Sequence, residues 1–301
     1  MSWAISGALL QLSLLGGGGC QGAPDLTDQA EVEAIAVCAH LPANANAASA
    51  GAYDRVNAYR LQAGLPCINF VPAIDSAATA HCAYYAGDHG SCIASPHREV
   101  STCDNFVAER FGDRMRRAGY TGSPAYEDMT YVGDGGTAVD DWINSIWHRI
   151  PILSPYVGDA GYGTAGQCDT MDFGWASPGP SAGAAPVVYP FDQQTGVPTS
   201  FDGDAESPAP PRPPKGWPSG YPIIAYAAQL DVHKHQLFDA DGALVDHAFL
   251  APGDDGGNGI LINEVVMYAN RPLKPQTVYR VVIEGVQKGN TVHLDWTFTT
   301  Q

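Results

Sequence analysis

The chain has 301 residues, of which only 16% are charged, and its formal net charge is -17 at pH 7. This length is sufficient for two domains of moderate size, each with a core of its own. The acidic balance argues against nucleic acid as a partner, because a protein that binds a phosphate backbone needs a basic face.

The first residues read as an export signal. Residues 3–15 are apolar but too few to span a bilayer, and small residues separate them from Cys20. The small-residue run before Cys20 is similar to a bacterial lipobox, which directs lipid attachment to the cysteine that follows. We therefore interpret residues 1–20 as a signal peptide with a possible lipobox and residues 21–50 as a tether. The alternative is a disordered cytosolic terminus, because the usual basic residue near the start is missing.

The cysteine count supports export to an oxidising compartment. Six cysteines remain after Cys20: Cys38, Cys67, Cys82, Cys92, Cys103 and Cys168. An even number of scattered cysteines in an exported chain predicts three disulfides. We favour a Cys92–Cys103 pair, because these two bracket a short polar loop, and leave the other pairings open.

Four helices are predicted in the first half, over residues 52–63, 72–85, 105–118 and 137–150. In the last of them, apolar residues recur every three to four positions, which is typical of a helix with one buried face. Pro151 and Pro155 are expected to end this helix, which places His148 and Arg149 near its end.

The histidines of the first half fall into two groups. His81 lies on the apolar face of the second predicted helix and is expected to be a satisfied core residue. His89 and His97 lie in the polar segment 86–104, which has no means of forming a core. Because loops often carry binding and catalytic residues, these two histidines are candidates for a site.

Composition and periodicity change after residue 175. Residues 176–220 are rich in Pro and Gly and are predicted to be a linker, semi-rigid towards its end. From residue 221 the pattern has a period of two, as in Val292, Leu294, Trp296 and Phe298. Short alternating segments separated by turn residues predict a β-sandwich over residues 221–301.

Several segments together resemble one known family. WINSIWHRIPIL (residues 142–153), followed by VGDAGYGTAG, resembles the signature of bacterial CAP-domain proteins, the cysteine-rich secretory, antigen 5 and pathogenesis-related 1 superfamily, also called SCP-like. RVNAYRLQAGLP resembles the opening helix of this family, AIDSAATAHCAYYA its second helix, and GDRMRRAGY the stretch before a family glutamate. Towards the C-terminus, RPLKPQTVYRVVIEGV and LDWTFTT resemble an Ig-like bacterial surface module.

The resemblance implies an α+β protein. A three-layer α-β-α sandwich, the CAP fold, would span residues 51–175, and an all-β Ig-like sandwich would follow. The family cleft usually carries two His and two acidic side chains. By resemblance, His148 and Glu127 are one of each, and His97 is the second His, with His89 as the alternative. The fourth member is open among Glu99, Asp140 and Asp141.

The chemistry of this set allows three interpretations. His97, Glu127 and His148 could bind a divalent metal, since two imidazoles and a carboxylate suit Zn²⁺. Without a metal, Glu127 and either His could act as an acid/base pair. Ser145 could hydrogen-bond His148 but has no oxyanion hole beside it in the sequence. In the third interpretation these side chains form a polar cluster that only pins loops to a helix.

Two functions follow. The first is a secreted or surface-anchored module that binds a small molecule, lipid, glycan or cell-wall component in the His/Glu cleft, with membrane contact only through a lipid on Cys20. The second is a metal-dependent hydrolase, for example a peptidase, that uses the same cleft. Ca²⁺ is a weaker expectation than Zn²⁺, because the acidic turns near the C-terminus contain no twelve-residue calcium loop with a closing Glu.

Overall fold

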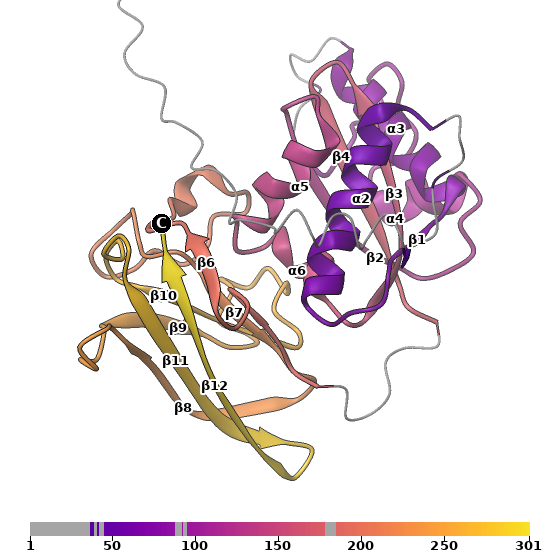
Figure 1. Ribbon diagram of the computed structural model, residues 1–301. Helices are drawn as coiled ribbons and strands as arrows, with labels where there is room; N and C mark the ends of the chain where they lie inside the picture. Colours follow the sequence, from indigo (N-terminus) through magenta and orange to yellow (C-terminus); the bar gives the residue numbers. More distant parts are fainter. Residues whose placement is uncertain (1–36, 39–40, 42–44, 88–91, 93–94, 178–184) are drawn as a thin grey trace, which may run out of the picture.

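The structure is a computed structural model that describes residues 37–38, 41, 45–87, 92, 95–177 and 185–301. The predicted signal segment with Cys20, most of the predicted tether, and His89 lie outside these residues. The described chain is of the mixed α and β class, with helices in its N-terminal half and strands dominating its C-terminal half (Figure 1).

One four-stranded sheet forms the centre of the N-terminal half. Its strands are β1 (Asn69–Phe70), β2 (Pro124–Thr130), β3 (Val157–Ala165) and β4 (Cys168–Trp175). They lie in the order β1-β3-β4-β2, so β2 is an edge strand. β1 is parallel to β3, and the other pairs are antiparallel.

Helices cover both faces of this sheet. They are α2 (Ala47–Gln62), α3 (Pro72–Ala86), α4 (Phe111–Arg117), α5 (Gly135–Ile143) and α6 (Arg149–Leu153). α3 approaches so closely that a Cβ on Gly163 would lie 2.0 Å from the backbone nitrogen of Thr79, so only glycine fits there. Tyr162 points the other way, into a core shared with α2, α5 and α6.

The first two predicted helices are present as α2 and α3. α2 begins earlier than expected, because the side chain of Asn46 accepts a hydrogen bond from the backbone N–H of Ser49 at 2.7 Å and caps the helix. α3 begins with Pro72 at its first turn, where the missing N–H costs no helical hydrogen bond.

The third helix is shorter than predicted. Residues 105–110 are not helical, and α4 begins only at Phe111. The backbone N–H groups of Val107 and Ala108 donate to the carboxylate of Glu99 at 2.7 and 3.2 Å. The buried carboxylate of Glu99 therefore satisfies these two N–H groups while the segment is not helical.

The prediction of one helix over residues 137–150 was wrong. α5 ends at Ile143, and a separate short helix, α6, begins at Arg149 with His148 as its N-cap. The carboxylate of Glu206 accepts the backbone N–H groups of Ile146 and Trp147, which therefore do not continue α5. Pro151 lies inside the first turn of α6, where its missing N–H is tolerated.

Two four-stranded sheets build the C-terminal half. The first has the order β5-β7-β10-β9, with β5 (Val187–Tyr189), β7 (Ile223–Tyr226), β10 (Glu264–Ala269) and β9 (His247–Leu250). The second has the order β6-β12-β11-β8, with β6 (Gln194–Val197), β12 (Asn290–Thr300), β11 (Val278–Gln287) and β8 (Leu230–Phe238). β5 pairs with β7 and β6 with β12, so the segment predicted as a linker contributes one strand to each sheet.

The two halves share one continuous apolar core. Trp296 and Phe298 of β12 are buried, as their alternation predicted, and belong to the same cluster as Trp142 of α5. Arg149 fastens α6 to the C-terminal half. Its guanidinium donates to the carbonyl of Pro222 at 2.6 Å and lies 4.8 Å from the ring centroid of Tyr221.

Three disulfides are present, as the cysteine count predicted. They join Cys38 to Cys67, Cys82 to Cys168, and Cys92 to Cys103. The favoured Cys92–Cys103 pair is therefore confirmed. The Cys82–Cys168 bond ties α3 to β4 directly. No helix within the described ranges is long and apolar enough to cross a bilayer.

Candidate functional site

His97 and Glu127 meet on the α3 side of the edge strand β2. Nδ1 of His97 lies 3.0 Å from Oε1 of Glu127, whose side chain is buried. The other carboxylate oxygen accepts a short hydrogen bond from the guanidinium of Arg114 on α4. Glu127 is therefore fixed from both sides, and it holds the His97 ring in one orientation.

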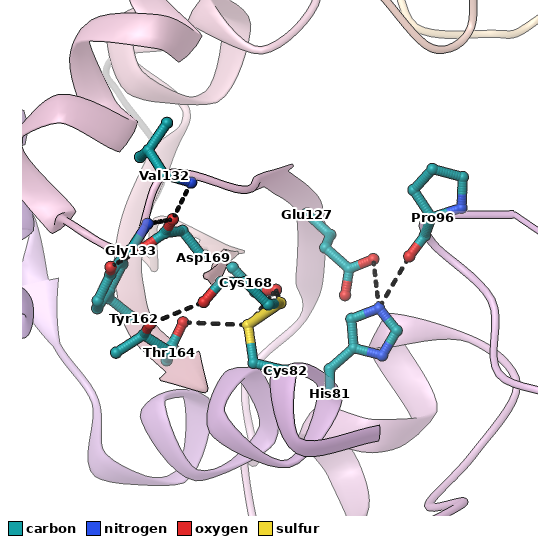
Figure 2. Close-up of a disulfide and its surroundings, with 12 residues drawn as sticks. His81, Cys82, Pro96, Glu127, Val132, Gly133, Tyr162, Thr164, Cys168 and Asp169 are labelled. Carbon is teal, nitrogen blue, oxygen red and sulfur yellow. Dashed lines mark hydrogen bonds and ion pairs between the residues drawn. A yellow bond between two sulfur atoms is a disulfide. The ribbon is translucent and has the colours of Figure 1, made fainter. Parts of the chain in front are cut away.

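A second His–carboxylate pair, His81 and Glu99, lies buried next to Glu127. His81, fully buried on α3, contacts Glu99 through Nδ1 at 2.8 Å and the carbonyl of Pro96 through Nε2 at 3.0 Å. Figure 2 shows the His81 ring pointing toward both Pro96 and Glu127, one residue from the Cys82–Cys168 bond. His81 is thus a satisfied core residue, as predicted.

His148 comes from the opposite face of the sheet. Its Nδ1 lies 3.3 Å from Oε1 of Glu206 and 3.2 Å from Oγ of Ser145. Ser145 also accepts the backbone N–H of His148 at 3.1 Å, so the ring and its backbone are held together. Trp147 donates its indole N–H to the carbonyl of Pro208, which fixes the segment that carries Glu206.

The two rings meet around the edge of β2. Consecutive residues of a strand point to opposite faces, so Glu127 faces α3 and α4 while Asp128 faces the α5 and α6 side. The ring centroids of His97 and His148 are 6.5 Å apart. Both rings line one pocket of about 360 Å³, together with Glu127, Asp128 and several aromatic side chains. The structure therefore brings His97, Glu127 and His148 into one pocket.

The acidic groups at this pocket have very different pKa values. Burial alone would raise the pKa of Glu127, but His81, Arg114 and His97 lower it to about 2. Burial, together with the carboxylates of Glu206, Glu127 and Asp172, raises the pKa of Asp128 well above its usual value. The pKa values of these two consecutive carboxyl groups are thus shifted in opposite directions.

The remaining candidates lie elsewhere. Glu99 is buried under the site and bound to His81 and to backbone N–H groups, so it does not line the pocket. Asp140 accepts a hydrogen bond from Tyr59 at 2.9 Å. Asp141 lies 3.4 Å from the hydroxyl of Thr130 and lines a neighbouring pocket of about 270 Å³, to which Ser145 and Glu206 also contribute.

Two acidic residues of the site were missed from the sequence. Glu206 lies in a Pro-rich stretch that reads as a linker, and no local pattern marks it. Asp128 directly follows Glu127, and a strand prediction for residues 124–130 would have placed its side chain on the opposite face. Among the described residues, no group of three or more His, Cys, Asp or Glu is arranged to hold a metal ion.

No family model and no curated protein matches the chain. The fold has similar solved structures. One is an extracellular protein containing an SCP domain from Bacillus anthracis str. Ames, with 22% identity, a TM-score of 0.36, and coverage of 42% of this chain and 39% of that one. Another is a cysteine-rich secretory protein from Staphylococcus aureus subsp. aureus Mu50, with 16% identity, a TM-score of 0.33, and coverage of 45% and 40%. The chain thus spans about two fifths of each, and at these TM-scores the likeness does not carry their functions to this chain.

Proposed function

We propose that this protein is an exported binding module that holds a small ligand in the pocket between His97 and His148. The observation that carries this proposal is the way both rings are held. A carboxylate, Glu127 or Glu206, contacts each Nδ1. In the part of the chain that the structure describes, neither Nε2 has a hydrogen-bond partner. Each ring is thus oriented by the protein and left with one nitrogen for a ligand.

The size and walls of the pocket suit such a ligand. Its volume of about 360 Å³ is within the usual range for small-molecule sites. Aromatic and aliphatic side chains make up most of its walls, among them Tyr126, Trp147 and Trp175. We infer a CAP-type domain over residues 51–175 and an Ig-like module after it, which would act as a spacer or adhesive part.

Export is supported by the three disulfides, because such bonds persist in oxidising compartments outside the cytosol. We propose that the protein is either released or held at the cell surface through a lipid on Cys20. Mass spectrometry of the protein from membrane and culture fractions separates these two possibilities, since lipidation adds a fixed mass to the peptide that begins at Cys20.

Ligand titrations of paired variants test the binding function. The probes are dodecylphosphocholine, tri-N-acetylglucosamine and a muropeptide, which represent a lipid, a glycan and a wall fragment. His97→Gln and His148→Gln remove the rings but keep an amide that can donate to the neighbouring carboxylate. We expect at least one probe to bind and to lose about tenfold or more in affinity in both variants. His293→Gln, on the exposed surface of β12, is the matched control.

Two outcomes would contradict the proposed binding function. If a probe binds the wild-type protein and both His variants with the same affinity, the pocket is not its site. If none of the probes or their close analogues binds, the interpretation of His97, Glu127 and His148 as a purely structural cluster is favoured.

One contact pattern, that of each His ring with its carboxylate, favours a metal-dependent hydrolase as the second candidate. An imidazole that binds a metal through one ring nitrogen commonly hydrogen-bonds a carboxylate through the other. Nδ1 of His97 and of His148 each contact a carboxylate in this way. These two rings would hold Zn²⁺, which would activate a water molecule for hydrolysis. Stoichiometric zinc in the purified protein, lost in His148→Ala together with a peptidase activity, would favour this function over simple binding.

A further inference from the structure

The pocket between His97 and His148 has an acidic and aromatic lining. Glu127 and Asp128 line it, and Glu206 contacts His148 at its border. No Lys or Arg of the described residues lines it. Arg114 forms an ion pair with Glu127. Glu206 contacts His148 and accepts two backbone N–H groups. Among the described residues, no Lys or Arg forms an ion pair with Asp128.

Asp128 is an unusual side chain for a protein interior. It is 2% exposed, and its Oδ2 has no hydrogen-bond partner among the described residues. Its strongest charged neighbours are all acidic, namely Glu206, Glu127 and Asp172. A buried carboxyl oxygen without a donor costs stability, and nearly all such atoms in native proteins have a partner. A ligand that supplies a donor and a positive charge would remove this cost.

The walls beside Asp128 match the rest of such a ligand. Tyr126 and Trp175 pack edge to face with ring centroids 5.2 Å apart, and both line the pocket with Phe111 and Trp147. Aromatic faces attract cations and pack against apolar groups. A phosphate or carboxylate would instead approach several carboxylates, with no Lys or Arg among the described lining residues to receive it.

From these contacts we infer that the pocket takes an organic ammonium ligand, whose charged head meets Asp128 and whose apolar body lies against Tyr126, Trp147 and Trp175. The inference rests on the proposed binding function and names the chemical class of the ligand. A metal ion would satisfy the carboxylates but would leave the aromatic walls without a role.

Three probes of nearly equal shape test the charge preference. Phenethylamine is a cation at neutral pH, 2-phenylethanol is its neutral counterpart, and phenylacetate is an anion. Titrations by calorimetry or NMR use the full protein treated with a chelator, so that bound metal cannot contribute. We expect phenethylamine to bind about tenfold or more tightly than 2-phenylethanol, and phenylacetate to bind more weakly than both.

Substitutions then test whether Asp128 causes the preference for the cationic probe. Asp128→Asn is nearly isosteric and is expected to abolish the advantage of phenethylamine while leaving 2-phenylethanol binding unchanged. Asp113→Asn is the matched control, because it removes one exposed carboxylate from α4, whose Phe111 lines the same pocket. We expect this control to keep the full preference for the cation.

Each outcome decides the inference. Equal binding of the three probes, or a preference that survives in Asp128→Asn, overturns it. If 2-phenylethanol binds and is lost in His148→Gln but the cation has no advantage, the proposed binding function stands and only the ligand class is wrong. If phenethylamine does not bind at all, the inference fails, and the lipid, glycan and muropeptide titrations decide the proposed function separately.

Discussion

Oε1 of Glu206 lies 3.3 Å from Nδ1 of His148, although Glu206 comes from the segment that leads into the C-terminal sheets. The same carboxylate accepts the backbone N–H groups of Ile146 and Trp147, which keeps α5 and α6 apart. One side chain from outside the helical half therefore sets both the backbone and the ring orientation of a residue in the candidate site. The helical half alone would lack this contact.

Replacing Glu206 tests that relationship. Glu206→Ala removes the carboxylate that accepts two backbone N–H groups and contacts the His148 ring, and Glu206 is only 7% exposed. We expect the free energy of unfolding to fall by about 2–3 kcal/mol, measured by urea denaturation. Asp204→Ala is the control, because Asp204 pairs with Arg212 at the surface and is expected to change stability by less than about 0.5 kcal/mol. Equal losses in the two variants would contradict the role assigned to Glu206.

Arg114 is expected to be the most sensitive charged residue beneath the site. It is fully buried and contacts the carboxylates of both Glu127 and Glu99. Arg114→Met would leave a buried carboxylate without its cation, so we expect a loss of about 3–5 kcal/mol in the free energy of unfolding. Arg116→Met, two residues away on the exposed side of α4, is expected to cost less than about 0.5 kcal/mol. Chemical denaturation of both variants gives the comparison.

Patterns local in the chain were predictable. The α2 and α3 helices, the alternation that buries Trp296 and Phe298, and the Cys92–Cys103 bond each depend on residues close in sequence. The family resemblance placed His97, Glu127 and His148 in one cleft, and these residues do line one pocket. That they bind a ligand stays a prediction.

Contacts from side chains outside the predicted helices were not predictable. Residues 137–150 have the apolar spacing of one helix, yet the carboxylate of Glu206 competes for the N–H groups that would continue it. Glu99 does the same to residues 105–110. In both places a carboxylate from outside the predicted helix, 59 or 60 positions away for Glu206 and 8 or 9 for Glu99, outweighs a local helical preference. Helix propensity is worth only tenths of a kcal/mol per residue. A single sequence does not reveal which acid reaches which backbone.

The disulfides are expected to contribute unequally to stability. Cys82 and Cys168 are separated by 86 positions, whereas Cys92 and Cys103 are separated by 11. If the bonds act mainly by restricting the unfolded chain, removing the first costs about 4.5 kcal/mol and removing the second about 3 kcal/mol. Denaturation of the Cys82→Ala/Cys168→Ala and Cys92→Ala/Cys103→Ala double variants measures this order. The reverse order would mean that native contacts, rather than loop closure, dominate.

Asp128 is expected to destabilise the protein at neutral pH. Because its folded-state pKa is raised above the ordinary value of 3.8, the folded protein holds this proton more tightly than the unfolded chain does. Stability is therefore lost as the pH rises above about 4. Asp128→Asn removes this loss, so its free energy of unfolding should exceed that of the wild-type protein by more at pH 7 than at pH 3. A difference that does not change with pH would contradict the assignment.

Glu127 should show the opposite pH dependence. Its folded-state pKa is lowered from 4.5 to about 2, so the unfolded chain takes up a proton first as the pH falls. The stabilisation from this group is complete above pH 4.5 and is lost as the pH falls toward 2. At about 1.4 kcal/mol per pKa unit, the loss is on the order of 3 kcal/mol. Urea denaturation at a series of pH values should show this slope in the wild-type protein and in Glu109→Gln, an exposed control. Glu127→Gln should lack it, and an unchanged slope in that variant would place the titration on another residue.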